Sequence, residues 1–128
     1  MVTYLKHWLP AIVFASLIFG LSAMSSPPGT DLAPDYLGHS IEYGLFAMTL
    51  LWGLTAGGCK SVTLFRGLGA WFMALAFAIT DEFHQSFVPN RYPSWHDVLA
   101  DAVGAALFIT VMVVVLRWRC AAVARLSE

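Results

Sequence analysis

Residues 79–101 read ITDEFHQSFVPNRYPSWHDVLAD, and this stretch is far more polar than the apolar sequence on either side of it. It contains four carboxylates, two histidines, one arginine and one glutamine. Pro89 and Pro93 interrupt helix formation, because proline lacks the backbone N–H and clashes with the preceding turn. The stretch therefore predicts the end of one helix, a short turn and the start of the next helix.

The rest of the chain has a composition typical of a protein that spans a lipid bilayer. Hydrophobic residues make up 59% of the 128-residue chain, charged residues make up 12%, and the mean hydropathy is +0.70. A soluble domain carries about 25% charged residues. We therefore expect one all-α membrane domain over residues 1–128. Because about 20 apolar residues span a bilayer, we predict four transmembrane helices, at residues 8–24, 36–56, 64–87 and 95–118.

The basic residues indicate how these helices are oriented. Only Arg91 falls in the first or third connector, and the other six lie at the chain ends or in the second connector: Lys6, Lys60, Arg66, Arg117, Arg119 and Arg125. Cytoplasmic loops carry an excess of Lys and Arg, so we predict two hairpins with both termini in the cytoplasm. The net charge of −1 gives no indication of a nucleic-acid partner.

The acidic residues have the opposite distribution. Seven of the eight fall on the outer side or in the outer half of a helix: Asp31, Asp35, Glu42, Asp81, Glu82, Asp97 and Asp101. An ionised carboxylate at the centre of a bilayer costs about 2.5–3.5 kcal/mol on insertion scales. These side chains should therefore face one another or a wet cavity. We predict a polar, acidic pocket that opens to the extracytoplasmic face.

The same residues resemble the motifs of the VanZ-like family of small bacterial membrane proteins. The first motif, D-K-x-x-H-x-x-x-Y, is matched by Asp35, His39 and Tyr43, with Tyr36 in place of the lysine. The second motif is matched by Asp81, Glu82, Gln85, Phe87, Pro89, Arg91, Ser94, Asp97, Asp101 and Gly104. The resemblance implies a multi-pass protein of the bacterial cytoplasmic membrane. It also implies a cell-envelope role linked to resistance to the antibiotic teicoplanin, without implying a reaction.

Several polar residues are candidates for chemistry or for ligand binding. The catalytic candidates are Glu82, Asp101, Glu42 and His39, because paired carboxylates and a histidine can carry out general acid–base catalysis. The predicted substrate-binding residues are Arg91, Gln85, Tyr43, Asp97, Asp81 and Asp35. For the adjacent pair Asp81 and Glu82, whose side chains point about 100° apart on a helix, we place Glu82 in the pocket and Asp81 beside it with Gln85.

Two alternatives to catalysis follow from the same residues. His39, Glu42 and Asp101 could bind a metal ion, since imidazole and carboxylate groups are common ligands of divalent cations. A buried hydrogen-bond network that only holds the helices together would explain the pattern equally well. The sequence therefore specifies no cofactor, and a divalent cation is one option among these.

The sequence leaves three classes of function open. The protein could be a membrane enzyme that acts on a lipid-linked or amphiphilic head group. It could be a small proton- or ion-coupled transporter, since ionisable residues within a membrane often mark ion pathways. It could also be an accessory protein that binds a lipid or an antibiotic without catalysis. The expected partners are the bilayer, an amphiphilic ligand and, for transport, a second copy of the chain.

Overall fold

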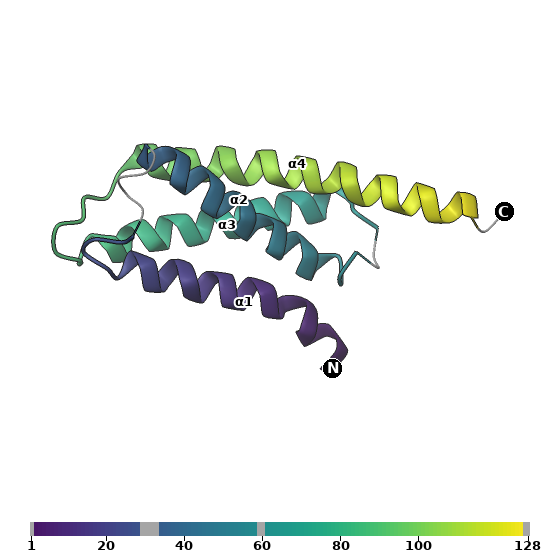
Figure 1. The fold of residues 1–128 in the computed structure, drawn as a ribbon, viewed down its shortest axis with the longest axis horizontal. Helices are drawn as coiled ribbons and strands as arrows, with labels where there is room; N and C mark the ends of the chain where they lie inside the picture. The colour runs from purple at the N-terminus through teal and green to yellow at the C-terminus, as the bar shows by residue number, and fades with distance from the viewer. Residues whose placement is uncertain (1, 29–33, 59–60, 127–128) are drawn as a thin grey trace.

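The computed structural model describes residues 2–28, 34–58 and 61–126 of the chain. These ranges contain four α-helices and no strands: α1 (Val2–Ser22), α2 (Asp35–Leu54), α3 (Leu64–Gln85) and α4 (Trp95–Leu126). Successive helices run in opposite directions, so α1 and α2 form one hairpin and α3 and α4 form the other (Figure 1). The predicted all-α architecture of four helices in two hairpins is confirmed.

The helix bounds follow the distribution of apolar residues and of helix-breaking residues. Thr63 caps the start of α3, where its side chain accepts a hydrogen bond from the backbone N–H of Arg66. The largest differences from the predicted bounds are at the chain ends, where α1 begins at Val2 and α4 continues to Leu126. Both helices extend beyond their most apolar part, which is all that a hydropathy-based prediction detects.

Three of the four helices are long and apolar enough to cross a membrane by length and composition. The qualifying segments are Leu5–Ser22 in α1, Leu64–Gln85 in α3 and Trp95–Arg119 in α4. Helix α2 is not among them, because His39, Ser40 and Glu42 lower the hydropathy of its first half. The polar half of α2 therefore needs partners within the bundle.

Helix α2 occupies the centre of the bundle. It contacts α1, α3 and α4, whereas no contact occurs between the described parts of α1 and α4. Its buried face includes Tyr43, Phe46, Ala47, Leu50 and Leu51. They belong to the same core cluster as three small residues of α3, namely Ala70, Ala74 and Ala78. The large apolar side chains of the outer surface, such as Phe72, Leu107 and Val111, remain exposed, as expected for a surface in contact with lipid.

Helices α2 and α4 run in the same direction and lie very close to each other at Gly104. A Cβ atom at this position would overlap the carbonyl oxygen of Ser40 and would lie 2.6 Å from its carbonyl carbon. The Ser40 hydroxyl donates a 3.0 Å hydrogen bond to the carbonyl oxygen of Ala100 at the same crossing. Small residues allow such close approach of helices in membranes. The crossing brings the first turns of α2 and α4 together.

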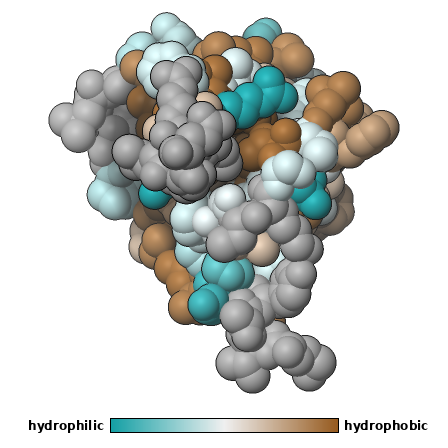
Figure 2. Space-filling model, turned by 90° about the vertical axis from the view of Figure 1, so that its right-hand side faces the viewer, coloured by the Kyte–Doolittle hydropathy of each residue, from teal (hydrophilic) through white to brown (hydrophobic). Residues whose placement is uncertain are grey.

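Both termini lie at one end of the bundle, together with the connector between α2 and α3 (Figure 1). Seen from this end, hydrophilic residues appear among apolar ones (Figure 2). The described basic residues Lys6, Arg66, Arg117 and Arg119 belong to this half of the molecule, whereas the side chains of Lys60 and Arg125 lie outside the described set. The other two connectors lie at the opposite end.

Candidate functional site

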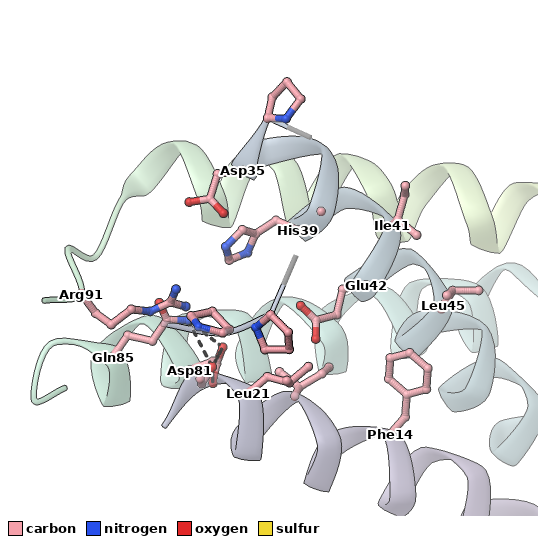
Figure 3. A pocket seen from close by; sticks show the side chains of 16 residues that line it. Phe14, Leu21, Asp35, His39, Ile41, Glu42, Leu45, Asp81, Gln85 and Arg91 are labelled. Carbon is pink, nitrogen blue, oxygen red and sulfur yellow. Dashed lines mark hydrogen bonds between the residues drawn. The ribbon is translucent and has the colours of Figure 1, made fainter. Parts of the chain in front are cut away.

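A cavity of about 420 Å³ lies at the end of the bundle opposite the termini. This volume falls within the range of about 300–1,000 Å³ that is usual for small-molecule sites. Helices α1, α2 and α3 and the connector between α3 and α4 all contribute to its wall (Figure 3). Six of the predicted site residues line it: Asp35, His39, Glu42, Asp81, Gln85 and Arg91.

The cavity has a charged end and an apolar end. Asp35 and Arg91 come from the first residue of α2 and from the connector, so they lie at the end of the bundle opposite the termini, which we call the outer end. Phe14 of α1 and Leu45 of α2 lie deeper along the bundle (Figure 3). Leu45 and Ile41, which lie one turn apart on α2, are both exposed although they line the cavity. The apolar wall therefore reaches the surface that would contact lipid.

A closed hydrogen-bond network connects α1 to α3 on one wall of the cavity. The Ser22 hydroxyl lies 2.6 Å from both carboxylate oxygens of Asp81. The Gln85 amide nitrogen donates to Ser22 Oγ at 3.2 Å and to Asp81 Oδ2 at 3.1 Å. All three residues are buried. The network satisfies polar groups that would be costly to leave unpaired in an apolar environment.

His39 and Asp101 form the closest pair of ionisable groups in the site. His39 Nδ1 lies 3.2 Å from Asp101 Oδ1, and Asp101 is only 2% exposed. This is the single contact within 4 Å between a basic and an acidic side chain among the residues that the structure describes. His39 lines the cavity and Asp101 lies behind it on α4. Asp101 can therefore orient the imidazole without contacting a ligand in the cavity.

Asp81 lines the cavity and Glu82 does not, which reverses the placement that we predicted for this adjacent pair. Glu82 Oε2 accepts a 2.9 Å hydrogen bond from the backbone N–H of Ser94, the residue before α4. Its side chain faces a smaller hollow of about 240 Å³, which is also lined by Pro93, Trp95 and Val98. The prediction failed because the spacing of residues does not show how α3 is rotated about its own axis. In the structure, Asp81 faces α1, where it bonds to Ser22, a partner that we did not predict.

Replacing Glu82 with alanine should loosen the connector between α3 and α4, because the partly buried N–H of Ser94 would lose its acceptor. We expect a loss of about 1–2 kcal/mol of stability and faster hydrogen exchange of the backbone amides in residues 86–94. Glu82→Gln keeps an acceptor oxygen and should retain most of the protection. Unchanged exchange in Glu82→Ala would contradict the anchoring role of this side chain.

Arg91 is the only permanent cation among the residues that line the cavity. Its guanidinium group forms no ion pair with any carboxylate in the described ranges, and its Nε is buried without a hydrogen-bond partner. Figure 3 shows the side chain extending from the connector toward the cavity. A guanidinium group that has no carboxylate partner among the described residues can bind a phosphate or a carboxylate with two hydrogen bonds.

The remaining predicted residues lie close to the cavity but do not line it. Tyr43 is 1% exposed and packs against the rings of Phe46 and Phe77 in the core. Asp97 is half-buried in the first turn of α4, and it lies near Asp35 and His39. We predicted His39, Glu42 and Asp101 as possible metal ligands. In the structure, the potential ligand atoms that lie within 4.8 Å of one another belong instead to Asp35, His39 and Asp97, which we call the tight group.

Two functional partners were not predicted from the sequence. Ser22 bonds to Asp81, and the backbone of Ser94 bonds to Glu82. A signal for Ser22 exists, since it is a polar residue near the outer end of the first apolar segment, at the depth expected for a residue facing the acids of α3. No sequence signal identifies a backbone N–H as a partner.

The sequence matches the family model described as VanZ/LLP1 over residues 14–117. This range begins in the middle of α1 and ends in α4, and it includes every residue that lines the cavity. No curated protein and no solved structure matches the chain.

Proposed function

The chain belongs to the VanZ/LLP1 family, and on this premise we propose that it is a cell-envelope membrane protein that binds the head group of a lipid-linked or otherwise amphiphilic molecule. The proposal places the cavity at the extracytoplasmic side of the bacterial cytoplasmic membrane and both termini in the cytoplasm. The excess of basic residues at the opposite end supports this orientation.

The combination of charged and apolar walls in one cavity is the observation that carries the proposal. Arg91, the permanent cation of the cavity lining, suits an anionic group such as a phosphate or a carboxylate. Phe14, Ile18 and Leu45 suit the first part of a hydrocarbon chain. An amphiphile in the outer leaflet would present these two parts in the same order along the membrane normal. A soluble polar ligand would leave the apolar wall unused.

The proposal favours binding over transport. Between the cavity and the end that carries the termini, the bundle is filled by core side chains that include Phe46, Leu50 and Leu51. These residues separate the cavity from the end that carries the termini. A ligand can therefore enter from the outer side or from the lipid, whereas passage to the other side would require repacking of the core. Proton- or ion-coupled transport is the alternative function. Uptake measured in sealed vesicles that contain the protein distinguishes transport from binding.

Arg91→Gln is expected to weaken the binding of an anionic amphiphile by about tenfold or more. The reason is that a hydrogen-bonded charge contributes about 1.5–3 kcal/mol, and a factor of ten corresponds to about 1.4 kcal/mol. Native mass spectrometry of the purified protein, with phosphatidylglycerol or a polyprenyl phosphate added, measures the occupancy directly. Arg119→Gln is the matched control, because this exposed arginine lies at the opposite end of the bundle.

The same measurement distinguishes between the proposed ligands. Retention of teicoplanin and of no phospholipid would support a direct role in resistance to this antibiotic. Retention of a polyprenyl phosphate would support a role with cell-wall intermediates. Equal loss in Arg91→Gln and Arg119→Gln would show that binding is a nonspecific effect of charge and would contradict the proposal.

A catalytic role is the second candidate, and the His39–Asp101 pair is the observation that favours it. A histidine oriented by a buried carboxylate is a common arrangement of a general base, and His39 lines the cavity. Glu42 lies on the same wall and could act as the partner acid. Turnover of a bound lipid, detected as a new product that disappears in His39→Gln, would establish an enzyme. A ligand recovered unchanged would favour an accessory binding protein.

A further inference from the structure

Two pairs of polar residues, one pair on α2 and one on α4, face each other. Asp35 and His39 are four residues apart on α2, and Asp97 and Asp101 are four residues apart on α4. Residues with this spacing lie on the same face of a helix. The two helices run side by side and in the same direction, so the pairs meet at the outer end of the bundle. Four donors of a kind that binds metal ions are therefore brought together.

The donor atoms are close enough to share one cation. A ring nitrogen of His39 and one oxygen each from Asp35 and Asp97 all lie within 4.8 Å of one another. Figure 3 shows the Asp35 carboxylate beside the His39 ring. The cluster is open to entry, since Asp35 is exposed and Asp97 is half-buried. Arg91 forms no ion pair with these carboxylates, so His39 is the basic side chain that lies closest to them among the described residues.

Asp101 provides a second and independent observation. Its side chain is almost completely buried, with only 2% exposed. Its Oδ1 contacts His39 Nδ1, whereas its Oδ2 has no hydrogen-bond partner among the described residues. A buried carboxylate directed at a histidine ring is costly without compensation. Histidines that bind metals usually donate the other ring N–H to a carboxylate, which fixes the tautomer. Asp101 is placed for that function.

We propose that Asp35, His39 and Asp97 bind a divalent cation and that Asp101 is the positioning residue for His39. In this arrangement, Asp101 accepts the Nδ1–H of His39, and Nε2 is the nitrogen that faces the cation. One imidazole and two carboxylates suit Zn²⁺ or Mn²⁺ better than Mg²⁺ or Ca²⁺, which prefer oxygen ligands. A protonated His39 paired with Asp101 is the alternative, in which the imidazolium rather than a metal ion would lie between Asp35 and Asp97.

The site does not depend on the proposed binding of an amphiphile, because its donors come from α2 and α4 alone. It differs from the set expected from the sequence, in which Glu42 was a ligand. Glu42 lines the cavity on the α1 side and does not belong to the tight group. A comparison of Glu42→Gln with Asp97→Asn therefore separates the two sets.

The test is isothermal titration calorimetry of the metal-free, full-length protein in detergent. The protein is titrated with ZnCl₂ and, in a separate experiment, with MnCl₂. We expect saturable binding of one equivalent, at least a tenfold loss of affinity in Asp97→Asn, and unchanged affinity in Glu42→Gln. Substitution with Co²⁺ should produce visible absorption bands that change in Asp101→Asn if Asp101 orients His39.

Three results would overturn the proposal. The first is the absence of saturable binding of either metal to the unmodified protein. The second is retention of affinity in both Asp97→Asn and Asp35→Asn. The third is an equal loss in Glu42→Gln, which would favour the alternative ligand set. Size-exclusion chromatography checks that each variant is folded, and Asp35→Asn provides the same test at an exposed position if Asp97→Asn does not fold.

Discussion

Gly104→Ala should destabilise the bundle by about 3 kcal/mol or more, at the upper end of the cost of overpacking a tightly packed interior. The added methyl group would overlap the backbone carbonyl of Ser40, and a backbone atom cannot rotate away as a side chain can. Helices α2 and α4 would have to separate, which would also break the hydrogen bond from Ser40 to Ala100. Thermal unfolding in detergent, followed by circular dichroism or by loss of the monodisperse peak, measures the effect.

Two other glycines provide matched controls. Gly20 lies within α1 with nothing within 4 Å of an added Cβ, so Gly20→Ala should be neutral or stabilising by up to about 1 kcal/mol. A Cβ at Gly44 would lie 2.5–3.0 Å from the ring of Phe108, and Phe108→Leu should therefore suppress much of the effect of Gly44→Ala. By contrast, no side-chain replacement should suppress the destabilisation caused by Gly104→Ala, because the clash is with a backbone atom. A wild-type midpoint for Gly104→Ala would show that α2 and α4 are not this close.

Asp81→Ala is expected to detach the outer end of α1 from α3. Ser22 and Gln85 would both lose their charged acceptor while remaining buried. Hydrogen bonds to charged groups contribute about 1.5–3 kcal/mol, whereas side-chain hydrogen bonds within membrane proteins average about 0.6 kcal/mol. We therefore expect a total loss of about 2 kcal/mol and faster amide exchange in the last two turns of α1.

The neighbouring Thr80 is the control for this prediction. Its hydroxyl bonds to the carbonyl oxygen of Phe77 within α3, and its side chain is exposed. Thr80→Ala should therefore leave the exchange of α1 unchanged. Asp81→Asn keeps one acceptor oxygen and should show an intermediate effect. If Asp81→Ala and Thr80→Ala were equally mild, the network would not hold α1 in place.

Much of the fold could be predicted from the sequence because the apolar segments are long and the breaks between them are strong. The proline-bounded turn around Arg91 and the acids on either side of it predicted a polar site formed by the second hairpin and α2. In the structure, Asp35, His39 and Glu42 line one cavity together with Asp81 and Gln85. These residues share helical faces, and the periodicity of a helix is readable from spacing alone.

The details that could not be predicted depend on the rotation of one helix relative to another. Asp81 and Glu82 are adjacent and chemically similar, so the spacing gives no reason to prefer either one for the cavity. Ser22 on α1 decides between them, since it bonds to Asp81. Likewise, the packing of Gly104 on the Ser40 backbone sets how Asp97 meets His39. Both contacts join residues more than fifty positions apart in the chain.

The central position of α2 has a consequence for how the protein is made. Its polar first half keeps it below the hydropathy of the other three helices, and its partners α3 and α4 are synthesised after it. During synthesis, α2 would therefore gain little from entering lipid alone, and its stable insertion would come with the second hairpin. A ribosome-bound chain that ends before α3 should leave α2 accessible to water-soluble reagents, and completion of α4 should protect it.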